Sequence, residues 1–260
     1  MTKTKRSSRT ARMARSAGVG KQKKLLRPPI RCVIFDLDDT LYDCFGQRVR
    51  PAQRHAARAM VRAGLRASVE AVYRARMRAF REDPRLRHID AAVMEQFGAT
   101  GDNAISRAAH DAYFNCPVGK LGLFRSSRPI LRHLKALGCA VFVVSFGEPK
   151  TQQAKVKALG LDREASIDRI FYADRDRQVT KDSAFREILR ITGLPPSRCL
   201  VIGDRPSSEI RAGKGLGMHT VRIRRGEYEM QEPAGREESP DVEIRVISAV
   251  RKLPFAFGKP

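Results

Sequence analysis

The 260-residue sequence lacks tryptophan, long apolar runs and grouped cysteines, and each absence excludes a class of protein. No apolar run approaches the ~18 residues that a membrane-spanning helix needs, so an integral membrane protein is excluded. The five cysteines, an odd number, form neither a Cys-x-x-Cys pair nor a zinc-ligand spacing. We therefore expect free thiols and a reducing compartment. The five histidines are dispersed, so no histidine metal site is predicted.

Acidic residues are absent from the first 28 positions, which carry ten lysines and arginines. The segment has no apolar periodicity, so residues 1–28 are predicted to be a disordered basic tail. Three roles for it remain open: nonspecific polyanion contact, organelle targeting, or an inert extension. We expect a cytoplasmic protein, with an organellar location as the alternative if the tail is a targeting segment.

The remainder of the chain is basic as well, because the formal net charge of +23 leaves +13 once the ten basic residues of the tail are subtracted. Residues 48–128 hold sixteen lysines and arginines and seven acids, which would attract a phosphorylated substrate. For each of these arginines, a position on a solvated helix face is as good an explanation as a role in attracting substrate. With 42% apolar residues, the chain can bury one large core, alone or with a small second domain.

Two aspartates follow an apolar run near the start of the chain. Residues 30–35 are apolar apart from one arginine and continue into Asp-Leu-Asp-Asp-Thr. Side chains alternate along a strand, so Asp36 and Asp38 should project to the same side. A carboxylate that attacks phosphorus needs a second group to protonate the leaving oxygen, and a divalent cation to relieve charge repulsion. Asp36, Asp38 and a third acid would meet these needs, although aspartates at strand ends also form ordinary turns.

Three more polar residues occupy comparable positions further along the chain. Ser145 ends the apolar run that begins at Val141, and Asp204 ends the run that begins at Leu200. Lys181 lies between them, at the start of a helical pattern. Because the carboxyl ends of parallel strands share one crevice, we expect these residues to meet Asp36 and Asp38 there.

This order of residues resembles the haloacid dehalogenase superfamily, over the region from about Arg31 to about Leu253. The resemblance implies that Asp36 is the nucleophile that becomes an aspartyl phosphate. It also implies that Asp38 is the general acid for the leaving group and then the base that activates water. Relatives that cleave carbon–halogen bonds lack an acid at this position, because halide leaves without a proton. The presence of Asp38 therefore favours phosphoester chemistry.

The resemblance assigns roles to three further residues. Thr40 would position Asp38 as part of the substrate site, and Ser145 would hydrogen-bond the transferring phosphoryl group. Lys181 would neutralise charge on that group and on Asp36. Two of these residues have other interpretations: Ser145 as a helix cap, and Lys181 as a solvated lysine, since Asp182 follows it where the family often has proline.

A magnesium ion is the cofactor that the resemblance implies. The Asp36 carboxylate, the Asp38 backbone carbonyl and Asp204 would hold it, with water and phosphate completing an octahedron. Glu209 stands where the family generally has aspartate, so it is assigned only as an outer-shell metal partner. A first-turn acid favoured by the helix dipole is the alternative for Glu209.

The predicted fold is α/β: a Rossmann-like parallel sheet with helices on both faces, plus an inserted α-helical cap. Strands are expected at 30–35, 141–145, 169–172, 200–204 and 218–223, with a last short strand and helix within 242–253. Cap helices are expected near 51–64, 68–81, 87–97 and 103–115, and core helices at 126–137, 149–159, 181–191 and 206–216. The domain division is a core at 29–46 and 126–253, a cap at 47–125, and a loose C-terminus at 254–260.

The predicted function is a magnesium-dependent phosphomonoester hydrolase that acts on a small phosphorylated metabolite through an aspartyl-phosphate intermediate. A phosphomutase on the same fold is an alternative, because cap contacts decide whether the phosphoryl group goes to water or back to the substrate. The other alternative function is that of a nucleic-acid-associated or regulatory protein that uses the basic tail. The sequence predicts neither the substrate nor the oligomeric state.

Overall fold

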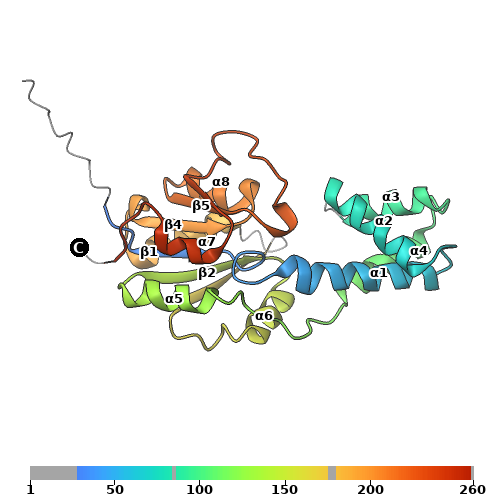
Figure 1. Ribbon diagram of the computed structural model, residues 1–260, viewed down its shortest axis with the longest axis horizontal. Helices are drawn as coiled ribbons and strands as arrows, with labels where there is room; N and C mark the ends of the chain where they lie inside the picture. Colours follow the sequence, from blue (N-terminus) through green and yellow to red (C-terminus); the bar gives the residue numbers. More distant parts are fainter. Residues whose placement is uncertain (1–27, 84–85, 175–179, 259–260) are drawn as a thin grey trace, which may run out of the picture.

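The computed structural model describes residues 28–83, 86–174 and 180–258, and within them one six-stranded sheet forms the middle of the larger of two lobes (Figure 1). The strands are β1 (Cys32–Phe35), β2 (Ala140–Phe146), β3 (Arg169–Ala173), β4 (Cys199–Gly203), β5 (His219–Ile223) and β6 (Val242–Ile244). All neighbouring pairs are parallel, and the order across the sheet is β3-β2-β1-β4-β5-β6. This confirms the predicted parallel α/β architecture.

The first strand in sequence occupies the middle of the sheet. In β1, Phe35 aligns with Val143 of β2 on one side and with Ile202 of β4 on the other. The backbone N–H of Asp36 still donates to the carbonyl of Ile202, at 2.8 Å. The ladder therefore holds Asp36 at the carboxyl end of the central strand, where neighbouring strands also end.

Helices cover both faces of the sheet, as predicted. Val33 and Phe35 belong to one apolar cluster together with residues of α5, whereas Cys32 and Ile34 belong to a second cluster together with residues of α7. The core helices are α5 (Ser127–Ala136), α6 (Pro149–Ala158), α7 (Lys181–Thr192) and α8 (Arg211–Gly215). The same part of the chain contains the short turns η2 (Pro196–Arg198), η3 (Pro206–Ile210), η4 (Gly226–Tyr228) and η5 (Ile247–Lys252). The helix predicted at 206–216 is thus a π-helical turn followed by α8, and the final predicted helix is 3-10.

Four helices inserted between β1 and β2 gather at one end of the molecule (Figure 1). They are α1 (Arg50–Arg62), α2 (Val69–Glu82), α3 (Leu86–Gln96) and α4 (Asn103–Phe114), and the π-helical turn η1 (Phe45–Val49) leads into them. They share an apolar cluster that includes Ala56, Met60 and Val72. Inside the inserted region the buried Arg76 and Asp90 form an ion pair of 2.5 Å. We propose that this insertion is the predicted cap.

The C-terminal segment corrects a prediction. Residues 254–260 were expected to be loose, but Phe255 is buried and Phe257 forms a parallel bridge with Ile30. The Ile30 N–H donates to the Ala256 carbonyl and the Gly258 N–H donates to the Ile30 carbonyl, both at 2.8 Å. Phe255 and Phe257 are only two aromatic residues, two positions apart, and this pattern is too short to predict a paired segment. The pairing also depends on Ile30, which lies more than 200 positions earlier.

The remaining predictions from composition concern the cysteines, membrane-spanning helices and the basic tail. All five cysteines are buried free thiols, as expected. Among residues 28–83, 86–174 and 180–258, no helix combines the length and apolar character needed to cross a lipid bilayer. The predicted basic tail falls outside the described residues, apart from Pro28.

Candidate active site

Asp36 lies at the centre of a buried cluster of charged side chains. The ammonium of Lys181 donates to Asp36 Oδ1, and it donates to Glu209 Oε2 at 2.6 Å. Lys181 begins α7, whose first turn is capped by Thr180 Oγ1 accepting from the Ser183 N–H. Burial alone would lower the pKa of Lys181, but the two carboxylates raise it above its usual range. The lysine is therefore a fixed cation beside Asp36, rather than a solvated lysine at a helix start.

Three carboxylates meet at the carboxyl ends of β1 and β4. One oxygen from each of Asp36, Asp204 and Glu209 lies within 4.8 Å of the others, and all three residues are buried. Burial raises the pKa of Asp36 to about 7 despite Lys181, and burial together with Glu209 raises the pKa of Asp204 well above its ordinary value. Three buried oxygen ligands in such proximity fit a hard divalent cation such as magnesium, which would relieve this repulsion.

Glu209 is closer to this centre than an outer-shell assignment implied. Burial raises its pKa, but Lys181 outweighs burial and holds the pKa below the ordinary value. Its Oε1 accepts from the Arg205 N–H at 2.8 Å, so both carboxylate oxygens have partners. A Cβ on Gly203 would lie 2.1 Å from Glu209 Cγ, so the glycine makes room for the longer side chain. Glu209 thus places its oxygen among those of Asp36 and Asp204.

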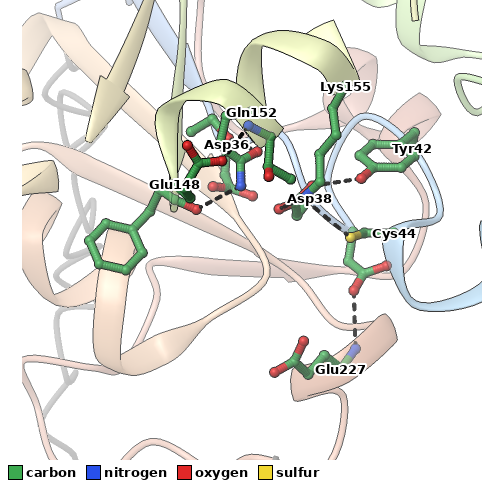
Figure 2. Close-up of polar contacts among 12 residues, drawn as sticks. Asp36, Asp38, Tyr42, Cys44, Glu148, Gln152, Lys155 and Glu227 are labelled. Carbon is green, nitrogen blue, oxygen red and sulfur yellow. Dashed lines mark hydrogen bonds and ion pairs between the residues drawn. The ribbon is translucent and has the colours of Figure 1, made fainter. Parts of the chain in front are cut away.

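Asp38 is held by residues that the sequence did not predict (Figure 2). The buried Lys155 of α6 donates to Asp38 Oδ2, and the Tyr42 hydroxyl donates to Asp38 Oδ1, both at 2.8 Å. Burial raises the pKa of Asp38, but Lys155 and Tyr42 outweigh burial and leave it below its ordinary value. Thr40 was expected to position Asp38; its hydroxyl is buried and has no hydrogen-bond partner among the described residues. Tyr42 and Lys155 make that contact instead.

Asp39 fixes the shape of the loop that carries Asp38. It is the one non-glycine residue with a positive φ in the described chain, at 53°. Its carboxylate accepts from the Phe45 N–H at 2.9 Å and from the Glu227 N–H at 3.2 Å. Gly226 comes so close that a Cβ there would lie 2.2 Å from Asp39 Cγ. The loop after β1 is therefore tied both to η1 and to η4.

Ser145 lies at the carboxyl end of β2, where it was predicted. Its hydroxyl donates to Gln152 Oε1 at 2.8 Å, and both residues are buried. Gln152 also donates to the Phe146 carbonyl, which orients the amide. Glu148, and not Ser145, caps α6, since its carboxylate accepts from the N–H groups of Lys150 and Thr151. Ser145 therefore does not have the capping role and lies buried at the end of β2.

Comparisons with known proteins agree with this geometry. Residues 30–217 match the family described as haloacid dehalogenase-like hydrolase. A glyceraldehyde 3-phosphate phosphatase from Methanopyrus kandleri is 32% identical over 235 residues, covering 86% of this chain and 98% of the relative. The enzyme of the same name from Methanocaldococcus jannaschii is 29% identical, covering 78% of this chain and 89% of the relative.

Solved structures share the fold. A predicted phosphoglycolate phosphatase from Haemophilus somnus aligns with a TM-score of 0.60 at 19% identity, covering 86% of this chain and 97% of its own. A Bacillus subtilis HAD-hydrolase bound to magnesium aligns with a TM-score of 0.58 at 20% identity, covering 86% of this chain and 98% of its own. The family match spans well over half of the chain, and the similar curated relatives are phosphatases. The chain therefore belongs to the haloacid dehalogenase-like hydrolases, as an enzyme of the phosphatase type.

Proposed function

We propose that this protein is a magnesium-dependent phosphomonoesterase that hydrolyses a small phosphorylated metabolite through an aspartyl phosphate on Asp36. One observation carries most of this assignment: Lys181 joins Asp36 to Glu209 within a carboxylate cluster, while Asp38 lies two residues further along the same loop. A nucleophile, a charge-neutralising cation and an acid–base group thereby surround one position.

The reaction follows from these positions in two steps. In the first, an Asp36 oxygen attacks phosphorus, the bond from phosphorus to the leaving oxygen breaks, and Asp38 gives that oxygen its proton. In the second, water attacks phosphorus, Asp38 takes the water's proton, and the bond to Asp36 breaks to release inorganic phosphate. Lys155 and Tyr42 outweigh burial and lower the pKa of Asp38, so the base form that the second step requires is favoured, and the first step draws on the less populated protonated form.

Other residues bind the group in transfer. The Lys181 ammonium can offset charge on the phosphoryl oxygens, because it is already placed beside Asp36. Ser145 can turn its hydroxyl from Gln152 to a phosphoryl oxygen. Asp36, Asp204 and Glu209, with the Asp38 carbonyl, would hold magnesium, which when bound reduces repulsion between the anionic nucleophile and the phosphate.

The substrate class is inferred from the relatives. Two archaeal relatives named glyceraldehyde 3-phosphate phosphatase align over 89% or more of their own length. We therefore expect a phosphomonoester of about the size of a triose phosphate.

The test is release of inorganic phosphate from a panel of small phosphomonoesters with magnesium. Asp36→Asn should abolish release because an amide cannot attack as an oxyanion. Asp111→Asn, at an exposed aspartate of α4, is the matched control and should retain full activity. Activity of Asp36→Asn within about tenfold of the wild type would refute the nucleophile assignment. Return of phosphate to another position of the substrate, without net release, would indicate a phosphomutase.

A further inference from the structure

Arg48 is a buried cation that has no carboxylate partner among the residues that the structure describes. It belongs to η1, the turn that joins the Asp38 loop to the inserted helices, and its exposed fraction is only 9%. Its Nη1 is buried and has no hydrogen-bond partner among the described residues. Burying an unpaired charged group is costly, so a guanidinium in this state needs a reason.

The other buried cations in the described part of the chain all have carboxylate partners. Lys181 pairs with Asp36 and Glu209, and Lys155 pairs with Asp38. Elsewhere in the molecule, the partner of Arg76 is Asp90 and that of Arg222 is Glu243. Arg48 is thus the exception among the five buried cations that the structure describes.

The surroundings of Arg48 place it on the same side of the site as Asp38 and Lys155. Its turn η1 contacts η4, which carries Glu227 and closes on the Asp38 loop. Cys44, just before η1, has its sulfur 3.9 Å from the Lys155 ammonium. Burial lowers the pKa of Lys155, but the charge of Asp38 raises it above its usual range. The nearby charge of Arg48 acts in the opposite direction and lowers the pKa of Lys155. Burial likewise raises the pKa of Tyr113 on α4, and Arg48 counteracts this.

The order of groups defines which part of a substrate would reach Arg48. In the proposed mechanism Asp36 and Lys181 act on phosphorus, and Asp38 acts on the ester oxygen. Lys155 pairs with Asp38, and the charge of Arg48 acts on both Lys155 and Tyr113, so Arg48 lies on the Asp38 side of the site. Lys155 is already neutralised by Asp38, which leaves Arg48 as the buried positive charge on this side without a carboxylate partner among the described residues.

We propose that the substrate carries a second anionic group, a carboxylate or a phosphate, which Arg48 binds at the end remote from the transferred phosphoryl group. A guanidinium offers paired N–H donors that match the oxygens of either anion. This assignment rests on the proposed phosphatase activity. It implies a preference different from that of the relatives' named substrate, whose far end is a neutral aldehyde.

A series of three-carbon phosphate esters with different far ends tests this directly. The series is 3-phosphoglycerate with a carboxylate, glycerol 1,3-bisphosphate with a phosphate, glyceraldehyde 3-phosphate with an aldehyde, and glycerol 3-phosphate with a hydroxyl. The wild type should show a kcat/KM at least about tenfold higher for one of the two anionic ends than for both neutral ends, the scale of one charge-assisted hydrogen bond. Which anion is preferred distinguishes the carboxylate from the phosphate.

Variants separate recognition from folding. Arg48→Gln should lower kcat/KM for the preferred anionic ester by about tenfold to a hundredfold and change the neutral esters less than about threefold. Arg48→Lys keeps the charge and should recover part of the preference. Arg50→Gln, at an exposed arginine two positions later, is the control and should change none of the four. Thermal unfolding of each variant establishes that it is folded.

The outcomes distinguish this assignment from the proposed function. Equal wild-type rates on all four esters, or an equal loss on all four in a folded Arg48→Gln variant, would overturn the role of Arg48 while leaving the phosphatase intact. Absence of phosphate release from every ester, including p-nitrophenyl phosphate with magnesium, would overturn both.

Discussion

Lys155 of α6 and Asp38 of the loop after β1 form an ion pair of 2.8 Å, although 117 positions separate them in the sequence. Tyr42 donates to the other oxygen of the same carboxylate. Both oxygens of the proposed acid–base group are therefore fixed before a substrate arrives. Because Lys155 comes from a core helix and Tyr42 from the loop itself, the orientation of Asp38 depends on how α6 packs against that loop.

Replacement of Lys155 should impair the chemical step. In Lys155→Met the Asp38 carboxylate loses its main partner, so we expect kcat to fall by about tenfold to a hundredfold, within the range of general acid–base contributions. Loss of Lys155 would raise the pKa of Asp38, so the second step, which needs Asp38 as a base, should be the one that slows. Because that step is common to all esters, good and poor leaving groups should show similar losses. Lys157→Met, at an exposed lysine of the same helix, should leave kcat unchanged. A loss confined to alkyl phosphates, with aryl phosphates unaffected, would contradict a role of Lys155 in keeping Asp38 in its base form.

Glu209 should govern metal affinity. In Glu209→Gln the shape of the side chain is kept, but one negative charge of the carboxylate cluster is removed. We expect the magnesium concentration for half-maximal activity to rise by about tenfold or more, the usual scale for residues that support a metal site. Direct manganese titration by electron paramagnetic resonance should show the same weakening. An unchanged metal affinity, judged against Glu187→Gln on the exposed face of α7, would place Glu209 outside the metal site.

Gly226 should be intolerant of any side chain. Its φ is +70°, and a Cβ would lie 2.2 Å from Asp39 Cγ. Gly226→Ala should therefore destabilise the protein by about 2–4 kcal/mol, combining backbone strain with overpacking. Gly193→Ala is the matched control: its φ is +61°, but nothing lies within 4 Å of the added atom. Urea unfolding should give a loss of only about 1–2 kcal/mol there, from backbone strain alone. Similar losses in both variants would show that the contact with Asp39 contributes nothing.

Glu164 should make stability depend on pH on the acid side. Burial raises its pKa, but hydrogen bonds from Arg132 and Ser166, with the charge of Arg128, hold the pKa below the ordinary 4.5. A depressed carboxyl pKa stabilises the fold above the unfolded-state value, and this contribution disappears as the pH falls through the folded-state value. Because both arginines are partly exposed, Glu164→Gln should cost only about 1 kcal/mol at pH 7.

The measurement for Glu164 is the difference in free energy of unfolding between the wild type and the glutamine variant at several pH values. The difference should be constant near neutrality and shrink toward zero as the pH falls below 4.5. A difference that grows on acidification would have the wrong sign for an ionised, ion-paired Glu164.

The sequence predicted those parts of the site that follow from strand ends. Asp36 and Ser145 stand where the predicted strands end, Asp204 follows directly after one, and Lys181 begins a helix. Helix bounds were accurate within two residues wherever proline or glycine marked them, as at Pro149 and Gly193. Each of these signals is local, so each can be detected without knowing what packs against the residue.

Long-range partners were not predictable in the same way. Lys155 lies in α6 near two other lysines, Lys150 and Lys157, and nothing in the local sequence marks it as the buried one. Tyr42 carried a weak signal, because it lies four residues after Asp38. Thr40 was assigned by resemblance, and its place as the partner of Asp38 is taken by residues that only the packing of α6 against the loop reveals.

The pairing of Ile30 with residues 256–258 makes the central strand depend on a distant part of the chain. The chain's opening strand is its central one, yet its neighbours β2 and β4 begin only at Ala140 and Cys199. Backbone hydrogen bonds to Ala256 and Gly258 hold Ile30, the residue that leads into this strand, although more than 200 positions separate them. Contacts this distant in sequence form late in folding, because a long loop must close first. We therefore expect the strand that carries Asp36 to acquire its neighbours late, so that the site is assembled only when most of the fold is complete.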